Sequence, residues 1–448
     1  PKGEVGITEP ITVDQIRLGF SPAALLRGQP LGGLTQVAFI APSISMDYEV
    51  YLGFAEMLNS KPRASAKRPR SDSQIPRTER TTHDYPDVSV AVQKGRLELE
   101  SADMPGVLRF DLVAHNSASK LRIRHLEIRQ GAGRLSASGT VDARGELAGR
   151  VEASDWLATT LSQYLPDLPV YGRGTVSARL KVAGTWDRPT VKGVASLQEA
   201  KLFSPLWETE EPMPIQSATV QFTFSGTSWD FDSFELLTAT GELTGRGSLI
   251  QDVLNLKVKA RDLRVPADIP HLTEWGVAGS VDFEGEITGT LADPLLAGRL
   301  ALGTGTLWNE PISEAQGHIE LTGQRFGFDE VQVQSGAACY YLEGVVSDLG
   351  GDSPDLDMHV QASEGRLEQL LSVIGVDLNA RGQVDGELVF AGPFGQIGSH
   401  GKVTVKGVEL YGETVEEAEG EYSWDDGEVY LRDVQARSHD GSLLVNGV

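Results

Sequence analysis

The sequence predicts an all-β protein, an elongated repeating β-groove in which a curved, trough-like antiparallel sheet carries one short helix per repeat of about 100 residues. Three observations predict this fold class. Short segments alternate between apolar and polar residues, 50 of the 448 residues are glycine, and sets of glycines recur with a period near 100. Alternation with period two is typical of strands that have one face in water, and a fixed internal period is typical of stacked repeats.

The recurring glycines define the length of the repeat. Three of them align at spacings of 105 and 103 residues: Gly184, Gly289 and Gly392. A second glycine follows each of these after nine residues: Gly193, Gly298 and Gly401. A third set lies near strand ends, at spacings of 108, 97 and 103: Gly139, Gly247, Gly344 and Gly447. Units that stack on their neighbours form an extended chain of repeats.

This period divides the chain into six predicted segments. They are an N-terminal β segment (1–60), a basic Pro/Ser/Arg-rich insertion (61–85), three β-groove repeats (86–170, 171–274 and 275–375) and a truncated β-groove repeat (376–448). We expect the insertion to be a solvated, flexible segment, with contact to anionic lipid headgroups as the alternative.

Each repeat also contains one segment that predicts a short helix. The segments begin at Ala153, Ala260 and Ala362, and each continues through an acidic residue into an apolar run: Trp156–Leu165, Val265–Leu272 and Leu367–Ile374. An acidic residue ahead of apolar residues at three-to-four spacing is typical of an N-cap and an amphipathic helix. We therefore expect the acidic or serine residue ahead of each run, such as Asp155, Asp262 or Glu364, to act as the N-cap of a short helix.

The remaining segments predict strands with one apolar and one polar face. In 175–182, for example, Val176, Leu180 and Val182 share one face, whereas Arg179 and Lys181 lie on the other. The apolar alternates that we expect to line the groove are Val176, Leu180, Val182, Val220, Phe222, Phe224, Leu254, Leu256, Val258, Val281, Phe283, Ile287, Val403 and Val405.

An apolar face of this kind has to be covered, and the sequence leaves two solutions open. One is a string of β-sandwiches with dry cores; the other is a single sheet bent lengthwise into a trough that shelters a non-protein ligand such as lipid acyl chains. Glycine within strands permits bulges and strong curvature, which favours the trough slightly.

Composition excludes several functions. A net charge of −24 argues against nucleic acid as a partner, and the single cysteine, Cys339, excludes an internal disulfide and a cysteine-based metal site. No apolar stretch is long enough to span a bilayer. The first residue is Pro1 and the last is Val448, within a predicted strand, so we interpret the sequence as a fragment of a longer protein.

The sequence contains no recognisable catalytic or cofactor motif. The eight histidines are scattered, and neither an HExxH pair nor a GxSxG elbow occurs. The acidic run Asp348–Asp357 lacks the spacing of a calcium loop, and we interpret it as a solvated turn. We therefore expect no enzymatic activity, no catalytic residues, no metal and no cofactor.

The glycine pattern resembles a known family. A Gly-x-Val start, an alternating strand, a Gly followed by Asp and Pro, and a further Gly before the next strand occur in 174–193 and 279–298. This pattern is similar to that of the AsmA-like superfamily, and within it to the TamB branch of translocation and assembly module proteins. The segments 13–26 and 37–44 are similar to the N-terminal part of such proteins. In the copy that begins near Val376, the Asp-Pro is replaced by 395–398.

The resemblance implies a function and a location. It implies a periplasmic protein, anchored in the inner membrane through an N-terminal segment absent from this chain, that carries phospholipid acyl chains along a hydrophobic groove to the outer membrane. It also implies a partner in the outer membrane, a barrel-assembly-type protein bound through an absent C-terminal domain.

Two other functions fit the pattern of strands. A scaffold or chaperone for outer-membrane protein insertion would use exposed strand edges to pair with nascent strands. A surface adhesin built of β-sandwich repeats would have dry cores, and would be expected to contain more aromatic residues and calcium loops than this sequence has.

Overall fold

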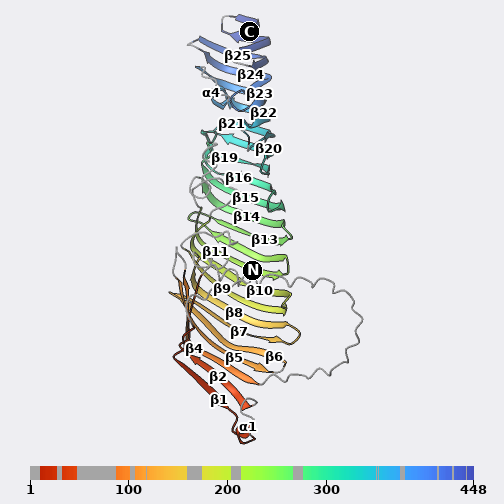
Figure 1. Ribbon diagram of the computed structural model, residues 1–448. Coiled ribbons are helices and arrows are strands. Elements are labelled where there is room, and N and C mark those ends of the chain that lie inside the picture. The colour runs from red at the N-terminus through yellow and green to blue at the C-terminus, as the bar shows by residue number, and fades with distance from the viewer. Residues whose placement is uncertain are drawn as a thin grey trace, which may run out of the picture. The chain divides into compact units, whose positions relative to one another are not determined.

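The computed structural model describes residues 11–27, 33–47, 87–100, 106–117, 119–158, 174–202, 213–265, 276–349, 351, 353–373, 379–410, 413–425, 428–439 and 441–447. These residues are almost entirely strand, which confirms the all-β prediction (Figure 1). Of the 27 strands, 25 are assigned to one open sheet, and β17 and β18 form a separate two-stranded ribbon. Among the described residues no helix is long and apolar enough to cross a membrane.

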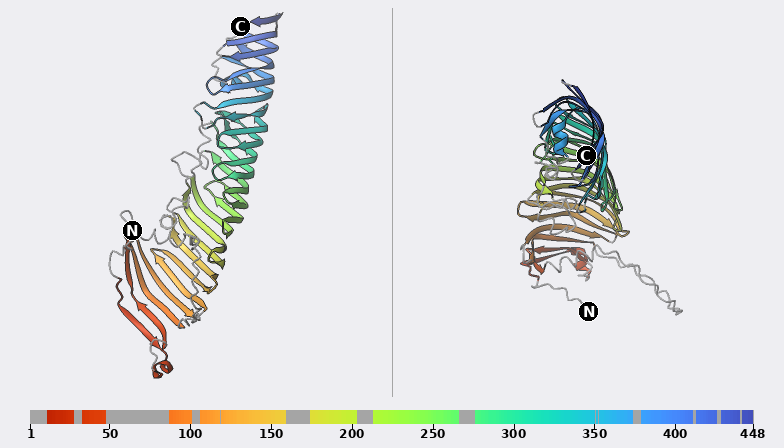
Figure 2. Two further views of the ribbon diagram at one scale, coloured as in Figure 1. Left: turned by 45° about the vertical axis from the view of Figure 1, so that its right-hand side comes forward. Right: turned by 90° about the horizontal axis from the view of Figure 1, so that it is seen from above.

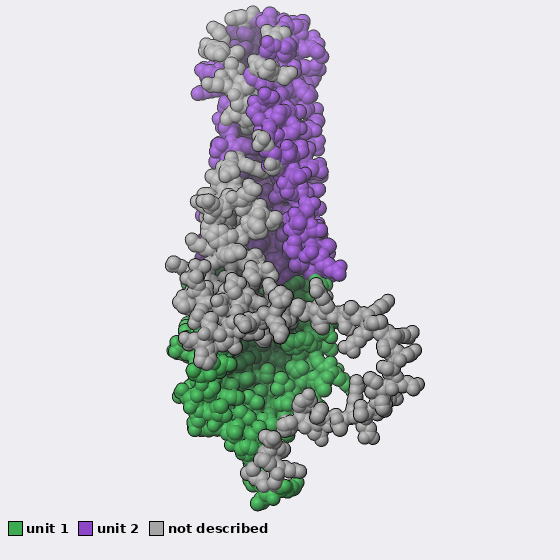
Figure 3. Space-filling model, in the orientation of Figure 1, with its two compact units in different colours: residues 1–202, 219–229 green, residues 203–218, 230–448 purple. Residues whose placement is uncertain are grey.

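The chain divides into two compact units, which Figure 3 shows in different colours. Unit 1 comprises residues 1–202 and 219–229, and unit 2 comprises residues 203–218 and 230–448. One point of division follows Leu202, and the other two lie within the strands β11 (Met213–Ser225) and β12 (Ser228–Leu237).

Unit 1 begins with one short helix and ten strands. They are β1 (Gln15–Phe20), α1 (Pro22–Leu26), β2 (Leu34–Ile40), β3 (Ser43–Asp47), β4 (Val88–Glu100), β5 (Gly106–Ser117), β6 (Lys120–Gln130), β7 (Gly133–Asp142), β8 (Glu146–Leu157), β9 (Thr175–Thr185) and β10 (Arg188–Leu202). From β4 to β10 each strand pairs antiparallel with the next one in the sequence.

The expectation of a purely antiparallel sheet is wrong at the start of unit 1. Both β2 and β3 pair parallel to β4, with Gln36 opposite Ser89 and Ser43 opposite Arg96. Between β2 and β3 lie Ala41, which has a φ of 50°, and Pro42, a residue that cannot donate to a sheet ladder. Together β2 and β3 therefore act as one interrupted strand beside β4.

Unit 2 continues the same arrangement of neighbouring antiparallel strands. Its elements are β13 (Glu242–Ile250), β14 (Val253–Val265), β15 (Gly279–Thr290), β16 (Pro294–Leu302), β17 (Gly305–Leu307), β18 (Glu310–Ile312), β19 (Glu314–Leu321), β20 (Arg325–Ser335), β21 (Ala338–Ser347), β22 (Asp355–Arg366), α4 (Leu367–Val373), β23 (Ala380–Pro393), β24 (Gly398–Leu410), β25 (Glu413–Asp425), β26 (Glu428–Ser438) and β27 (Gly441–Gly447). Apart from β17 and β18, which form the separate ribbon, the strands follow one another in chain order from β13 to β27, so that β16 pairs with β19 (Figure 2).

The aligned glycines share one backbone conformation. Gly184, Gly289 and Gly392 have φ values of +91°, +89° and +121°, and an added Cβ would lie 2.6, 2.6 and 2.9 Å from the carbonyl oxygen four residues later. Each of these glycines is the second-to-last residue of the first strand of a hairpin. Only glycine adopts this backbone without strain, so the recurrence of glycine here has a local geometric cause.

The second set of aligned glycines has a different cause. At Gly193, Gly298 and Gly401 an added Cβ would collide with the backbone carbonyl of the neighbouring strand, from Arg179, Glu284 and Glu387 respectively. The three glycines face the same side of the sheet as the apolar alternates. They therefore let adjacent strands approach closely on that face, as strongly bent strands require.

The predicted N-caps are wrong, because these residues form β-bulges. Asp155, Asp262 and Glu364 lie within β8, β14 and β22, where the register shifts, and their φ values are 55°, 51° and 51°. In each case the backbone N–H donates to a side chain on the next strand: the Oγ of Ser177 at 3.3 Å, the Oδ1 of Asp282 at 2.8 Å and the Oδ1 of Asp385 at 2.8 Å.

Of the three predicted helices, the described residues contain one. The segment Leu367–Val373 forms α4 directly after the bulge of β22. The first predicted helix lies in part within β8, and its remainder falls mostly outside the described residues; the second, apart from Val265 at the end of β14, also lies outside them.

Candidate functional site: the apolar face and its closed section

Antiparallel registers in unit 1 align apolar residues into rows that cross the sheet. One row runs from β5 to β10 through Phe110, Ile128, Leu135, Ala153, Ala178 and Ala195. The adjacent row, over the same strands, is Leu112, Leu126, Ala137, Val151, Leu180 and Gly193. We call this surface the apolar face of unit 1.

Unit 2 has rows of the same kind. One row runs over eight strands, from β14 to β23, through Leu256, Ile287, Leu296, Leu321, Phe326, Val346, Leu356 and Gly392. The neighbouring row includes Phe328, Gly344, Met358 and Phe390. This surface, the apolar face of unit 2, also contains most of the largest cluster of buried apolar side chains.

All fourteen residues predicted to line a groove lie on strands and are buried or half-buried. Val258, Val281 and Phe283 belong to the buried cluster of unit 2, and Leu256, Ile287 and Val403 pack against it. Half-buried residues in the two units are Val176, Leu180, Val182, Val220, Phe222, Phe224, Leu254 and Val405. Phe222 and Phe224 pack on Trp229, with ring centroids 5.3 and 4.7 Å apart.

The two apolar faces differ in how far they are buried. In unit 1 the side chains of Leu180 and Val182 are half-buried. In unit 2, Met358 and Phe390 are each only 2% exposed. We call the part of this face around Met358 and Phe390 the closed section. The ribbon β17–β18 and the helix α4 lie against it.

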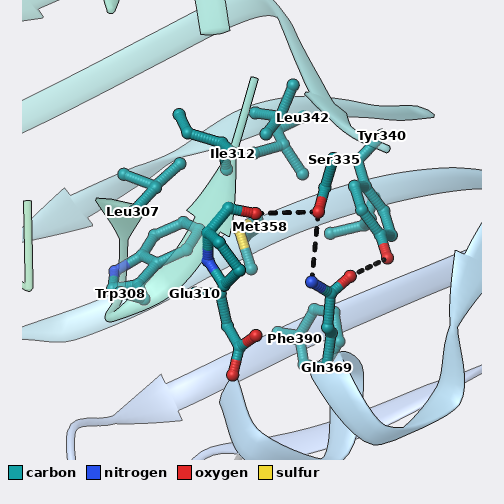
Figure 4. Close-up of a pocket in the computed structure, with 13 residues that line it drawn as sticks. Leu307, Trp308, Glu310, Ile312, Ser335, Tyr340, Leu342, Met358, Gln369 and Phe390 are labelled. Atoms are coloured by element: carbon teal, nitrogen blue, oxygen red, sulfur yellow. Dashed lines mark hydrogen bonds between the residues drawn. The ribbon is translucent and has the colours of Figure 1, made fainter. Parts of the chain in front are cut away.

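A small apolar cavity remains in the closed section. Its volume is about 70 Å³, and its walls come from the ribbon, from α4 and from strands β20 to β23 (Figure 4). The lining residues are Leu307, Trp308, Glu310, Pro311, Ile312, Val333, Ser335, Tyr340, Leu342, Met358, Val360, Gln369 and Phe390. The exposed surface inside the cavity is almost entirely apolar, so water there would find few hydrogen-bond partners.

A chain of hydrogen bonds joins the elements around this cavity. The Oγ of Ser335 donates to the carbonyl of Pro311 at 2.8 Å, and the Nε2 of Gln369 donates to that Oγ at 3.1 Å. The hydroxyl of Tyr340 donates to the Oε1 of Gln369 at 3.1 Å and accepts from the backbone N–H of Arg366 at 2.9 Å. Figure 4 shows the three side-chain bonds that link ribbon, sheet and helix. We call this chain, from Pro311 to Tyr340, the latch.

The three latch side chains are buried, so their hydrogen bonds affect the stability of the closed section. Ser335, Tyr340 and Gln369 are 8%, 8% and 6% exposed. Burial is the main reason that the pKa of Tyr340 is raised above its ordinary value of 10.0. A buried hydroxyl or amide that loses its partner destabilises the state in which it is buried.

The ribbon is fixed to the sheet on its other side. The backbone N–H of Asn309 and the Oγ1 of Thr306 both donate to the carbonyl of Gly276, each at 3.0 Å. The turn residues Trp308 and Asn309 have φ values of 51° and 65°. A bulky residue such as Trp308 is uncommon at positive φ, and surrounding contacts have to hold it there.

The opposite face of the sheet is polar and carries cross-strand ion pairs. Lys257 Nζ lies 3.2 Å from Glu286 Oε1, and Lys259 Nζ lies 2.5 Å from Glu284 Oε2. These side chains are largely exposed and their charges are screened by solvent, so the pairs contribute little to stability. These charged side chains make this face of the sheet hydrophilic.

One constellation escaped the sequence analysis. On β4 and β5, Ser89 Oγ lies 2.9 Å from His115 Nδ1, and His115 Nε2 lies 2.6 Å from Oδ1 of Asp87. Ser89 and His115 are register partners, which no sequence motif shows. The carboxylate of Asp87 is 72% exposed, whereas a catalytic triad needs a buried one, so we assign these contacts to strand pairing.

Comparison of the chain with protein-family models, with curated proteins and with solved structures finds no match. Within the described ranges, no group of three or more His, Cys, Asp or Glu side chains is placed to hold a metal ion. The apolar faces and the closed section are therefore the candidate functional surfaces of the described residues.

Proposed function

We propose that this chain is a segment of a bridge-like lipid transfer protein, and that its apolar faces form a trough for phospholipid acyl chains. The observation that carries the proposal is the continuity of the apolar rows from strand to strand within each unit. Each methylene kept out of water is worth about 0.8 kcal/mol, so a chain that moved along such a row would avoid the cost of re-entering water.

The strand arrangement also supports this proposal over a string of β-sandwiches. A sandwich covers the apolar face of one sheet with a second sheet, whereas here 25 strands belong to one open sheet and the only other described sheet has two short strands. The glycines that allow close strand approach on the apolar face are consistent with a bent sheet.

The resemblance to the AsmA-like superfamily and its TamB branch adds a setting to the proposal. In that setting the protein spans the periplasm, is anchored in the inner membrane, and delivers phospholipid towards a barrel-assembly-type partner in the outer membrane. Lipid transfer requires no cofactor or catalytic residue.

Native mass spectrometry with lipid extraction tests the proposal. Val182→Asp places a charge on the apolar face of unit 1, at a half-buried position where it disturbs folding less than at the 4%-exposed Val281. Lys181→Asp is the matched control, because Lys181 directly precedes Val182 on the same strand and faces the polar side. We expect phospholipid to co-purify with the wild-type protein and with Lys181→Asp, and to be lost from folded Val182→Asp.

Two results would contradict the proposal. One is a folded, lipid-free wild-type protein that takes up no phospholipid from vesicles. The other is equal lipid content in Val182→Asp and Lys181→Asp.

A further inference from the structure

We propose that α4 is a flap over the apolar face of unit 2, that Gln369 holds it shut, and that it must lift before an acyl chain can pass the closed section. The inference rests on the proposed function for the identity of the passing chain.

The cavity shows that the closed section is incompletely packed. Strands, ribbon and helix surround about 70 Å³ of space that their apolar side chains leave unfilled. Atoms that line such a space have lost packing contacts on one side, which lowers the cost of opening. An acyl chain that entered from the row containing Met358 and Phe390 would fill this space.

The two elements that cover the cavity are held differently. The ribbon is tied down by backbone hydrogen bonds, including those between Thr306 and Ala278 at 2.9 and 3.1 Å. From α4, by contrast, Gln369 is the residue that lines the cavity and bonds to the side chains of Ser335 and Tyr340. We therefore assign the ribbon as the fixed side of the closed section and α4 as the moving side.

A polar latch suits reversible closure. Once α4 lifts, Gln369, Ser335 and Tyr340 can form hydrogen bonds with water. Opening therefore leaves no buried polar group of the latch without a hydrogen-bond partner. An apolar contact of equal size would expose its surface to water on opening. In the closed state the direction of each bond fixes the position of the helix.

Cysteine labelling tests the flap without any lipid. In a Cys339→Ser background, a reporter Met358→Cys lies in the cavity wall, where the residue is 2% exposed. A second reporter, Val258→Cys, replaces a residue that is 5% exposed and lies outside the cavity. The rate of maleimide labelling is then compared with and without Gln369→Ala, and thermal melts establish that each variant is folded.

Gln369→Ala removes the hydrogen-bond partner of the buried hydroxyls of Ser335 and Tyr340, so it destabilises the closed state. We expect labelling of Met358→Cys to become roughly tenfold faster, and labelling of Val258→Cys to remain unchanged. The triple variant Ser335→Ala/Tyr340→Phe/Gln369→Leu replaces the three polar side chains of the latch by apolar ones, and the leucine fills the space of Gln369. Among the described groups, only the carbonyl of Pro311 and the backbone N–H of Arg366 lose their partners, so we expect this variant to label more slowly than Gln369→Ala.

Three outcomes would overturn the flap: no change at Met358→Cys, equal acceleration at both reporters, or labelling of the triple variant as fast as that of Gln369→Ala. Transfer of a fluorescent phosphatidylcholine between phosphatidylcholine vesicles is measured on the same proteins. Faster transfer in Gln369→Ala supports both proposals. Selective labelling with no transfer in any protein would retain the flap and refute the proposed lipid transfer.

Discussion

The backbone N–H of Glu364 donates a 2.8 Å hydrogen bond to the Oδ1 of Asp385, across the bulge that β22 forms against β23. The other carboxylate oxygen of Asp385 lies 3.0 Å from the Nζ of Lys406 on β24. One side chain therefore ties three neighbouring strands together. Asp282 occupies the equivalent place in the preceding repeat and accepts from the N–H of Asp262.

This relationship predicts a pH dependence of stability. The hydrogen bond from Glu364, and then that from Lys406, hold the pKa of Asp385 below its ordinary value of 3.8. The ionised carboxylate therefore stabilises the fold above the unfolded pKa, and this contribution is lost as pH falls through the native pKa. We expect Asp385→Ala to lower the free energy of unfolding by about 1–2 kcal/mol at neutral pH, and by less in acid.

Urea unfolding at neutral and acidic pH measures this effect. Glu419→Ala serves as the control, since Glu419 and its partner Lys402 are 56% and 66% exposed and the pair should contribute little. An Asp385→Ala defect of equal size at both pH values would contradict the prediction.

Glycine on the apolar face should be intolerant of a single methyl group. In Gly401→Ala the new Cβ would collide with the carbonyl oxygen of Glu387. We expect a loss of about 1–3 kcal/mol in unfolding free energy, because the two strands would have to separate. Gly323→Ala is the matched control, as an added Cβ there meets nothing within 4 Å. Similar melting temperatures for the two variants would show that the close approach is not needed.

The closed section should be sensitive to the removal of a buried ring. Phe390 is 2% exposed, whereas Phe394, four residues later, is 47% exposed. We expect Phe390→Ala to cost about 3–5 kcal/mol in unfolding free energy. Phe394→Ala should stay within about 0.5 kcal/mol of wild type, and denaturant titration compares the two. A small effect at Phe390 would mean that this section is not packed in solution.

Two tyrosines should ionise late in an alkaline titration. Burial is the main cause that raises the pKa of both Tyr340 and Tyr422 above 10.0. Stability that depends on these neutral hydroxyls is complete below pH 10.0 and is lost as pH rises through the native pKa values. Ultraviolet absorbance follows tyrosinate formation, and we expect Tyr340→Phe and Tyr422→Phe each to remove one late-titrating group. A titration curve unchanged above pH 10.0 in Tyr340→Phe would refute this assignment.

The faces of the strands could be predicted from the sequence, because side chains alternate with period two on any extended strand. Val176, Leu180 and Val182 needed no tertiary information to be placed on one side. The helix at Leu367–Val373 was equally visible in its apolar spacing. These features depend only on local backbone geometry.

The bulges could not be predicted with the rules that found the helices. Aspartate is favoured at helix N-caps, and it is also among the residues that tolerate positive φ. Asp262 is therefore compatible both with a helix N-cap and with the positive-φ position of a β-bulge. What distinguishes them is Asp282, 20 residues away, whose carboxylate receives the N–H of Asp262.

The closed section could not be predicted from the sequence either, because its residues are far apart along the chain. Ser335, Tyr340 and Gln369 meet only through the pairing of β20 to β23 and the position of α4. The turn at Trp308 and Asn309 lacks the Asn-Gly or Asp-Gly pair that commonly indicates a tight hairpin. Neither the cavity nor its latch corresponds to a local sequence signal.

The bulges at Asp155, Asp262 and Glu364 have a consequence for how such a chain can change in evolution. A single-residue insertion within a strand would turn every following side chain of that strand to the opposite face. A bulge absorbs one extra residue and restores the alternation beyond it. One-residue insertions and deletions should therefore be tolerated at these bulges, at others such as those of Lys94, Glu330 and Asp433, and at hairpin turns, and be eliminated by selection in the regular parts of the strands.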